Sequence, residues 1–146
     1  MIDNRFRGHA LALWLFVPLT FMKVVLGLAH IFRVDGGAQS VSTIPLNTYP
    51  AGAAQNIVAL MARMGLEQLL LGLIFVVVLV RYRALIPLMY VVAVLHYVGQ
   101  TGVKAVKPLA LAGISGASTV HLVIAAVSLA GLVLSVSGRG YRNAPP

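Results

Sequence analysis

The sequence contains no cysteine and very few acidic residues. Among its 146 residues are 3 aspartates and glutamates, against 11 lysines and arginines. Without cysteine the chain can form neither a disulfide nor a thiolate metal site, and it has no cysteine nucleophile. Any bound metal would need histidine and carboxylate ligands.

Charged residues of both signs make up only 10% of the chain, whereas 60% of the residues are hydrophobic. This composition offers too little polar surface for a soluble globular protein, so we expect an integral membrane protein. A formal net charge of +8 would suggest a nucleic-acid partner in a soluble protein. Here most basic residues lie at the edges of hydrophobic segments, where they anchor to lipid headgroups, and no nucleic-acid partner is expected.

Four hydrophobic runs are each close to the roughly 20 residues needed to cross the hydrocarbon of a bilayer. They cover residues 10–32, 57–80, 84–103 and 118–136. The sequence therefore predicts an all-α integral membrane protein, a four-transmembrane-helix bundle that forms a single domain over residues 1–146. The first run is too long for the core of a signal peptide, so we expect it to remain as an anchor. The start of the fourth helix is the least defined boundary, because prolines and glycines precede it.

The basic residues beside these runs predict the topology. One side of the membrane receives Arg5, Arg7, Arg81, Arg83, Arg139 and Arg142, and the other receives Arg33, Lys104 and Lys107. The positive-inside rule then places both termini in the cytoplasm. Residues 33–56 become a long external loop, in which glycines and prolines oppose a regular helix. The expected location is the bacterial cytoplasmic membrane, as a multi-pass protein.

Among the polar side chains within the hydrophobic runs, seven are candidates for a functional site. They are Lys23, His30, Arg63, Glu67, His96, Gln100 and His121. A charge at the centre of a membrane helix costs at least about 2.5 to 3.5 kcal/mol on insertion scales, so such residues usually face one another or a wet cavity. With about 1.5 Å of rise per residue, all seven fall in the external half of the bundle. We predict a polar half-core there, which either binds a ligand or holds the helices together by ion pairs; no catalytic residue is predicted.

Lys23 and Glu67 both fall near the middle of the membrane by this estimate. They are expected to form either a structural ion pair between the first two helices or a proton-transfer pair. Arg63 lies four residues before Glu67 and can pair with it within one helix. Its planar guanidinium could instead clamp an anionic headgroup.

The sequence predicts no cofactor, although three alternatives stay open. His30, His96 and His121 could hold a metal together with Glu67, but no two histidines have the close spacing of a metal-binding motif. His121 together with His30 or His96 could ligate a haem in the core of the bundle. A quinone is the third alternative, although the tyrosines, among them Tyr97, are expected to serve in packing and interfacial belts.

Three parts of the sequence resemble the DoxX-like group of small bacterial four-helix membrane proteins. They are the stretch Ala62-Arg-Met-Gly-Leu-Glu-Gln-Leu-Leu-Leu-Gly-Leu73, the basic hairpin Arg81-Tyr-Arg83 and the segment Gly99-Gln-Thr-Gly102. The resemblance implies the four-helix architecture, and through some members of the group an association with redox complexes. The long external loop and Lys23 have no counterpart that we can map onto the group. No site residue is carried over from it.

These observations favour a small non-catalytic integral membrane subunit or assembly factor of a membrane complex. Its partners would be membrane lipids and other transmembrane subunits, or further copies of the same chain. The alternative is a membrane module that binds a quinone, a lipid or another hydrophobic ligand, with a redox role open. Catalysis is not favoured, because the membrane segments hold one carboxylate and lack the second acid that paired acid–base work needs.

Overall fold

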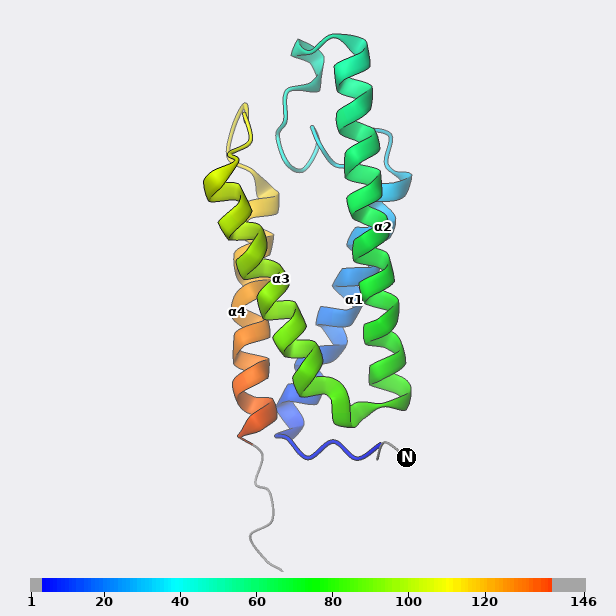
Figure 1. Cartoon of the computed structure of the whole chain (residues 1–146), viewed down its shortest axis with the longest axis vertical. Helices are drawn as coiled ribbons and strands as arrows, with labels where there is room; N and C mark the ends of the chain where they lie inside the picture. The colour runs from blue at the N-terminus through cyan, green and yellow to red at the C-terminus, as the bar shows by residue number, and fades with distance from the viewer. Residues whose placement is uncertain (1–3, 138–146) are drawn as a thin grey trace, which may run out of the picture.

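The computed structural model describes residues 4–137, which form α-helices, short 3-10 turns and loops, with no β-strand. The helices are α1 (Ala10–Phe32), α2 (Ala51–Arg81), α3 (Ile86–Val106) and α4 (Gly116–Val136). Two 3-10 turns, η1 (Leu46–Thr48) and η2 (Arg83–Leu85), precede α2 and α3. All four long helices have the length and hydropathy needed to span a membrane. Figure 1 shows them running along the long axis of the molecule.

The bounds of α1 agree with the predicted span, whereas α2 and α4 are longer than predicted, and α3 begins two residues later and ends three residues later than predicted. The second helix begins at Ala51, six residues before the expected residue 57. The helix starts directly after Pro50, whose extended backbone forms the N-cap, and the alanines that follow favour a helix. The third helix continues to Val106 and ends where Pro108 disfavours a helical conformation at the residue before it. The fourth begins at Gly116, two residues before the expected start.

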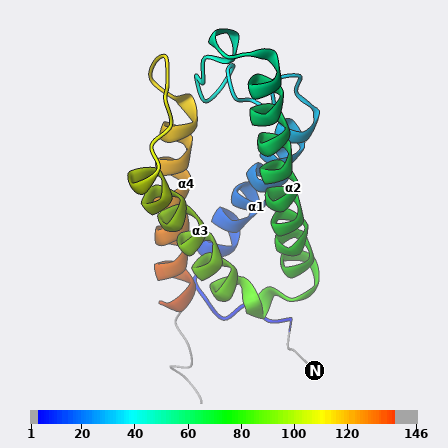
Figure 2. The same cartoon turned by 45° about the horizontal axis from the view of Figure 1, so that its top comes forward.

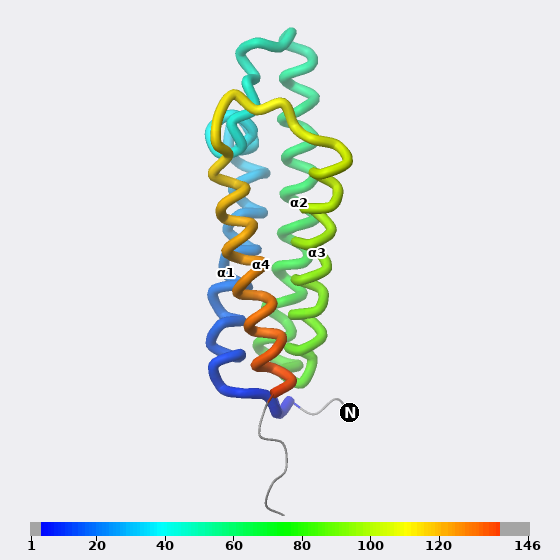
Figure 3. The backbone as a smooth tube through the Cα atoms, turned by 90° about the vertical axis from the view of Figure 1, so that its left-hand side faces the viewer, coloured from blue at the N-terminus to red at the C-terminus, as the bar shows by residue number. Residues whose placement is uncertain are grey.

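The four helices pack unevenly. α1 packs along α2, α3 packs along α4, and α1 also contacts α4, whereas α2 and α3 barely touch. Figures 1 and 2 show α2 and α3 diverging from the short turn that joins them. We call the end that contains η2 and the start of α1 the hairpin end. The opposite end, with residues 33–50 and 107–115, is the loop end; Figure 3 shows both loops there.

Glycines allow α1 and α2 to approach closely. A Cβ atom added at Gly27 would lie 2.7 Å from the Leu69 nitrogen, and one added at Gly65 would lie 2.6 Å from the His30 Cβ. A Cβ atom at Gly72 would lie 3.1 Å from the backbone nitrogen of Val24. The absence of side chains at these positions therefore fixes both the distance between the two helices and their rotation.

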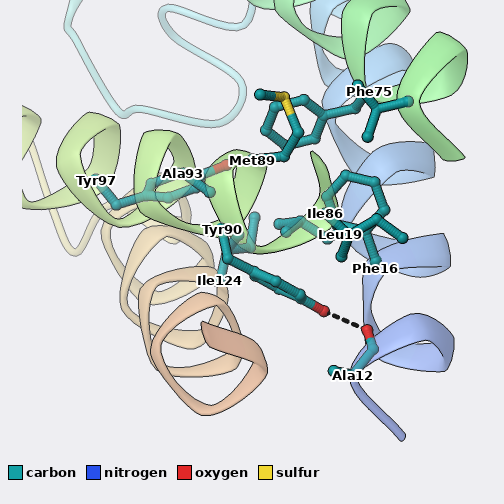
Figure 4. Packing of buried hydrophobic residues seen from close by; sticks show 11 residues of the cluster. Ala12, Phe16, Leu19, Phe75, Ile86, Met89, Tyr90, Ala93, Tyr97 and Ile124 are labelled. Atoms are coloured by element: carbon teal, nitrogen blue, oxygen red, sulfur yellow. Dashed lines mark hydrogen bonds between the residues drawn. The ribbon is translucent and has the colours of Figure 1, made fainter. Parts of the chain in front are cut away.

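The hairpin-end half of the bundle has an aromatic and aliphatic core (Figure 4). The Phe16 ring lies 5.1 Å from the Phe75 ring and 5.4 Å from the Tyr90 ring, measured between centroids. The Tyr90 hydroxyl donates a 2.6 Å hydrogen bond to the Ala12 carbonyl oxygen. The Tyr90 ring also lies over Gly131, where any added Cβ atom would overlap it. This core joins α1, α2, α3 and α4 without a buried charge.

The N-terminal segment crosses the hairpin end. The His9 amide donates to the Leu134 carbonyl oxygen at 3.1 Å, and the Arg83 amide donates to the Asn4 side-chain oxygen at 3.0 Å. These bonds tie the segment to α4 and to the turn before α3. Of the basic residues expected at this end, Arg139 and Arg142 lie outside the described residues.

The two loops at the loop end are bonded to each other. The backbone amide of Ala112 donates to the Thr43 carbonyl oxygen at 2.9 Å, and the Thr43 hydroxyl donates to the Gly113 carbonyl oxygen at 3.1 Å. The α1–α2 loop therefore reaches across the bundle to the α3–α4 connection (Figure 2).

Asp35 organises the start of the α1–α2 loop. Its carboxylate accepts hydrogen bonds from the amides of Gly37 at 2.9 Å and Ser40 at 2.7 Å. Partial burial acts to raise the pKa of Asp35, but the bonds from Ser40 and Gly37 outweigh it and lower the pKa to about 2. The carboxylate is therefore a structural element of the loop.

Candidate functional site

Lys23 lies inside the bundle with no exposed surface. Its Nζ has no hydrogen-bond partner within the part of the chain that the structure describes. Nζ lies over the Tyr97 ring, 4.5 Å from its centroid, in a cation–π contact. A buried amine normally has an acceptor, so this nitrogen is the most unusual polar atom in the fold.

Two histidines lie against Tyr97, which is 3% exposed. The centroid of the His96 ring lies 5.1 Å from that of Tyr97, and the centroid of His121 lies 5.6 Å from it. Both contacts are edge-to-face. Lys23, His96, Tyr97 and His121 thus form one group from α1, α3 and α4, which we call the Lys23 cluster.

The Tyr97 hydroxyl is the second buried polar atom without a hydrogen-bond partner among residues 4–137. The sequence indicated Tyr97 as a packing or belt residue and did not include it in the site. A signal was present, because Tyr97 directly follows His96 and shares a helix face with Thr101 and Lys104. Its position beside Lys23 depends on the packing of α1 against the other helices, which spacing within α3 does not encode.

Gln100 and His30 belong to the edge of this region. The Gln100 side-chain amide donates a 3.1 Å hydrogen bond to His96 Nε2, one turn away on α3. His30 instead donates from Nδ1 to the Gly36 carbonyl oxygen at 2.7 Å and so holds the α1–α2 loop. Gln100 therefore orients a member of the Lys23 cluster, whereas His30 has a local structural role.

Glu67 and Arg63 lie on the outer surface of α2 and are exposed. The expected ion pair between Lys23 and Glu67 is not formed, and no ion pair joins Arg63 to Glu67 among the described residues. The Lys23 backbone lies beside Gly72, five residues beyond Glu67: a Cβ atom added at Gly72 would be 3.3 Å from the Lys23 carbonyl carbon. The estimate that placed Lys23 and Glu67 level was therefore wrong, because it counted inward from residue 57, whereas α2 begins at Ala51 and packs Gly65 against His30.

The rotation of α2 follows from its glycines. Gly65 faces α1, and a residue two positions away in either direction is turned by about 200° on a helix. Arg63 and Glu67 are both two positions from Gly65, so the contact that buries the glycine turns both charges outward. The glycine pattern could have indicated this from the sequence.

The histidines do not assemble with carboxylates. Among residues 4–137, no group of three or more histidines, cysteines, aspartates and glutamates is close enough to hold a metal ion. His30 is engaged by the loop, and His96 and His121 each contact the Tyr97 ring. The described residues therefore do not form the metal site of the three histidines with Glu67 that was considered from the sequence.

Comparisons with protein-family models, curated proteins and solved structures gave no match for this chain.

Proposed function

We propose that this protein is a non-catalytic subunit or assembly factor of a membrane complex, and that it joins the complex through the outer face of α2. The observation that carries the proposal is the exposure of Glu67 on that face. The residue lies about 21 Å along the helix from Arg81, within a hydrocarbon layer of about 30 Å. A carboxylate that faces lipid at this depth is costly, and a partner helix removes the cost.

The surroundings of Glu67 suit a helix–helix contact. Leu66 and Leu70 are each at least half exposed beside it, and Arg63 lies one turn nearer the loop end. The partner we propose is a transmembrane helix with a basic side chain opposite Glu67 and an acidic side chain opposite Arg63. Such pairs inside a membrane are a known means of holding helices together.

The proposal includes a topology and a location. Arg5, Arg7, Arg81 and Arg83 belong to the hairpin end, whereas Arg33, Lys104 and Lys107 belong to the loop end. By the positive-inside rule the hairpin end and both termini face the cytoplasm, and the longer loop is external. We place the protein in the bacterial cytoplasmic membrane and, on the stretch of residues 62–73, among the DoxX-like proteins.

Photo-crosslinking in intact membranes tests this proposal. A photoreactive amino acid at Leu70, beside Glu67, should capture a polypeptide of defined mass, whereas one at the exposed Leu129 of α4 should capture lipid only. The Glu67→Leu substitution should abolish the crosslink from position 70. Arg81→Gln removes a charge from the same helix outside the hydrocarbon and should leave the crosslink intact. Capture that persists in Glu67→Leu, or no capture at position 70, would contradict the proposal.

A further inference from the structure

The Lys23 cluster contains one amine, one phenol hydroxyl and two imidazoles, and it contains no carboxylate. Lys23 Nζ and the Tyr97 hydroxyl are both enclosed and both without a partner among the described residues. Glu67, the one carboxylate in the membrane-spanning helices, is turned to the opposite side of α2. The cluster is therefore short of one acceptor with negative charge, which the chain itself does not supply.

The surroundings of the cluster restrict how an acceptor can arrive. At the loop end, the bonds of Thr43 to Ala112 and Gly113 join the two loops across the bundle. At the hairpin end, the packed core around Phe16 and Tyr90 closes the route. Between α2 and α3 the helices hardly contact each other, and Figures 1 and 2 show them diverging toward the loop end. Of the neighbouring helix pairs, α2 and α3 have the fewest contacts.

We propose that the Lys23 cluster binds the anionic headgroup of a single amphiphile, which enters from the membrane between α2 and α3 and leaves its acyl chain in the lipid. A carboxylate or phosphate oxygen would accept hydrogen bonds from Lys23 Nζ and the Tyr97 hydroxyl. His96, held by Gln100, and His121 flank the same ring and bound the headgroup site on the α3 and α4 sides. This site lies on the other side of α2 from Glu67 and does not depend on the subunit proposal.

The depth of Lys23 favours a small headgroup. Its backbone lies beside Gly72, about 13 Å along α2 from Arg81 and so near the middle of the hydrocarbon layer. A fatty-acid carboxylate reaches this depth with one chain, whereas a phospholipid must bring its glycerol and second chain as well. Both share the anionic oxygen that the cluster lacks, and the experiment separates them.

The test is a titration of the purified, delipidated full-length chain with oleate, followed by native mass spectrometry in a neutral detergent. We expect one saturable oleate per chain. Oleyl alcohol has the same acyl chain without the charge and should bind at least about tenfold more weakly, as expected for loss of a charge-assisted hydrogen bond. Phosphatidic acid with oleoyl chains tests whether a phosphate is preferred to a carboxylate. If it binds more tightly than oleate, the headgroup belongs to a phospholipid, and the proposed anion site is still supported.

Variants connect the binding to the named atoms. Lys23→Met removes the amine with little change in side-chain length and should weaken oleate binding at least about tenfold. Tyr97→Phe removes only the hydroxyl and should weaken binding about two- to tenfold. Lys104→Met is the matched control, because this lysine is exposed at the loop end and donates to Ser118; its affinity for oleate should be unchanged.

Three results would overturn the proposal: no saturable adduct with either amphiphile, equal binding of oleate and oleyl alcohol, or unchanged affinity in Tyr97→Phe together with Lys23→Met. If Lys23→Met does not fold, the affinity of Tyr97→Phe for oleate alone tests the proposal. Glu67→Leu should bind oleate normally, so failure of this site and failure of the α2 contact would be observed separately.

Discussion

The two halves of the bundle differ in how far their polar groups are satisfied. In the hairpin-end half, the buried Tyr90 hydroxyl reaches the Ala12 carbonyl oxygen, and aromatic rings fill the space between the helices. In the loop-end half, Lys23 and Tyr97 are buried with unpartnered polar atoms, and Glu67 is exposed on α2. In the hairpin-end half, the chain itself supplies the partner of the buried hydroxyl. In the loop-end half, polar groups are left for which other molecules could supply partners.

The difference has a consequence for the energetics of the fold. Burial of apolar and aromatic surface, with a satisfied hydrogen bond, stabilises the hairpin-end half without an energetic penalty for buried charge. The loop-end half carries the cost of its unpaired groups, which close packing of α1 on α2 through Gly27 and Gly65 has to offset. Substitutions in the two halves should therefore have opposite effects on stability.

The largest expected effect is in the hairpin-end half. Gly131→Leu would place a side chain where the Tyr90 ring lies and should lower the free energy of unfolding by about 3 kcal/mol or more, or prevent folding. Gly99→Leu is the matched control, because no atom lies within 4 Å of a Cβ added there. Denaturant titration in detergent micelles measures both. Equal stability of the two variants would show that the Tyr90 core does not hold the fold together.

The second expected effect has the opposite sign. Lys23→Met replaces an enclosed amine without a partner by an apolar side chain of similar length, and should stabilise the delipidated protein by about 1 to 3 kcal/mol. The same titration measures it. A loss of stability comparable to that in Gly131→Leu would mean that Lys23 is satisfied within the chain, and the contrast between the halves would disappear.

A smaller loss is expected for Tyr90→Phe, which removes the hydrogen bond to the Ala12 carbonyl oxygen and keeps the ring. The free energy of unfolding should fall by about 1 kcal/mol. Tyr97→Phe is the counterpart in the other half, since its hydroxyl has no partner among the described residues. In the delipidated protein this variant should be neutral or slightly stabilising; similar losses at both positions would contradict the comparison.

The smallest effect concerns the loop that covers the loop end. The folded-state pKa of Asp35 is about 2, below its ordinary value of 3.8. A depressed pKa means that the carboxylate contributes stability above about pH 3.8, which is lost as the pH falls toward 2. Thermal unfolding between pH 5 and about 2 should show a small decline that is absent in Asp35→Asn. An identical pH dependence in the variant would show that Asp35 does not organise the loop.

Hydrophobic runs of sufficient length were enough to predict the four helices, and α1 was predicted with its observed bounds. The start of α2 was predicted too late, because Asn56 and Gln55 were assigned to the loop although a helix tolerates them in its exposed first turns. Of the seven candidate residues, Lys23, His96 and His121 lie around Tyr97. The direction of Glu67 was missed, because helix rotation is fixed by contacts between helices, here those of Gly65 and Gly72 with α1.

The central claim is that Glu67 contacts a helix of a partner protein and forms no ion pair within the bundle. It is tested most directly by the stability of the isolated chain carrying Glu67→Leu, measured by denaturant titration in the same detergent as the wild type. An outward-facing carboxylate without an internal partner predicts a free energy of unfolding that is unchanged or higher. A loss of about 3 kcal/mol or more, as removal of one member of a buried ion pair would produce, would contradict the account.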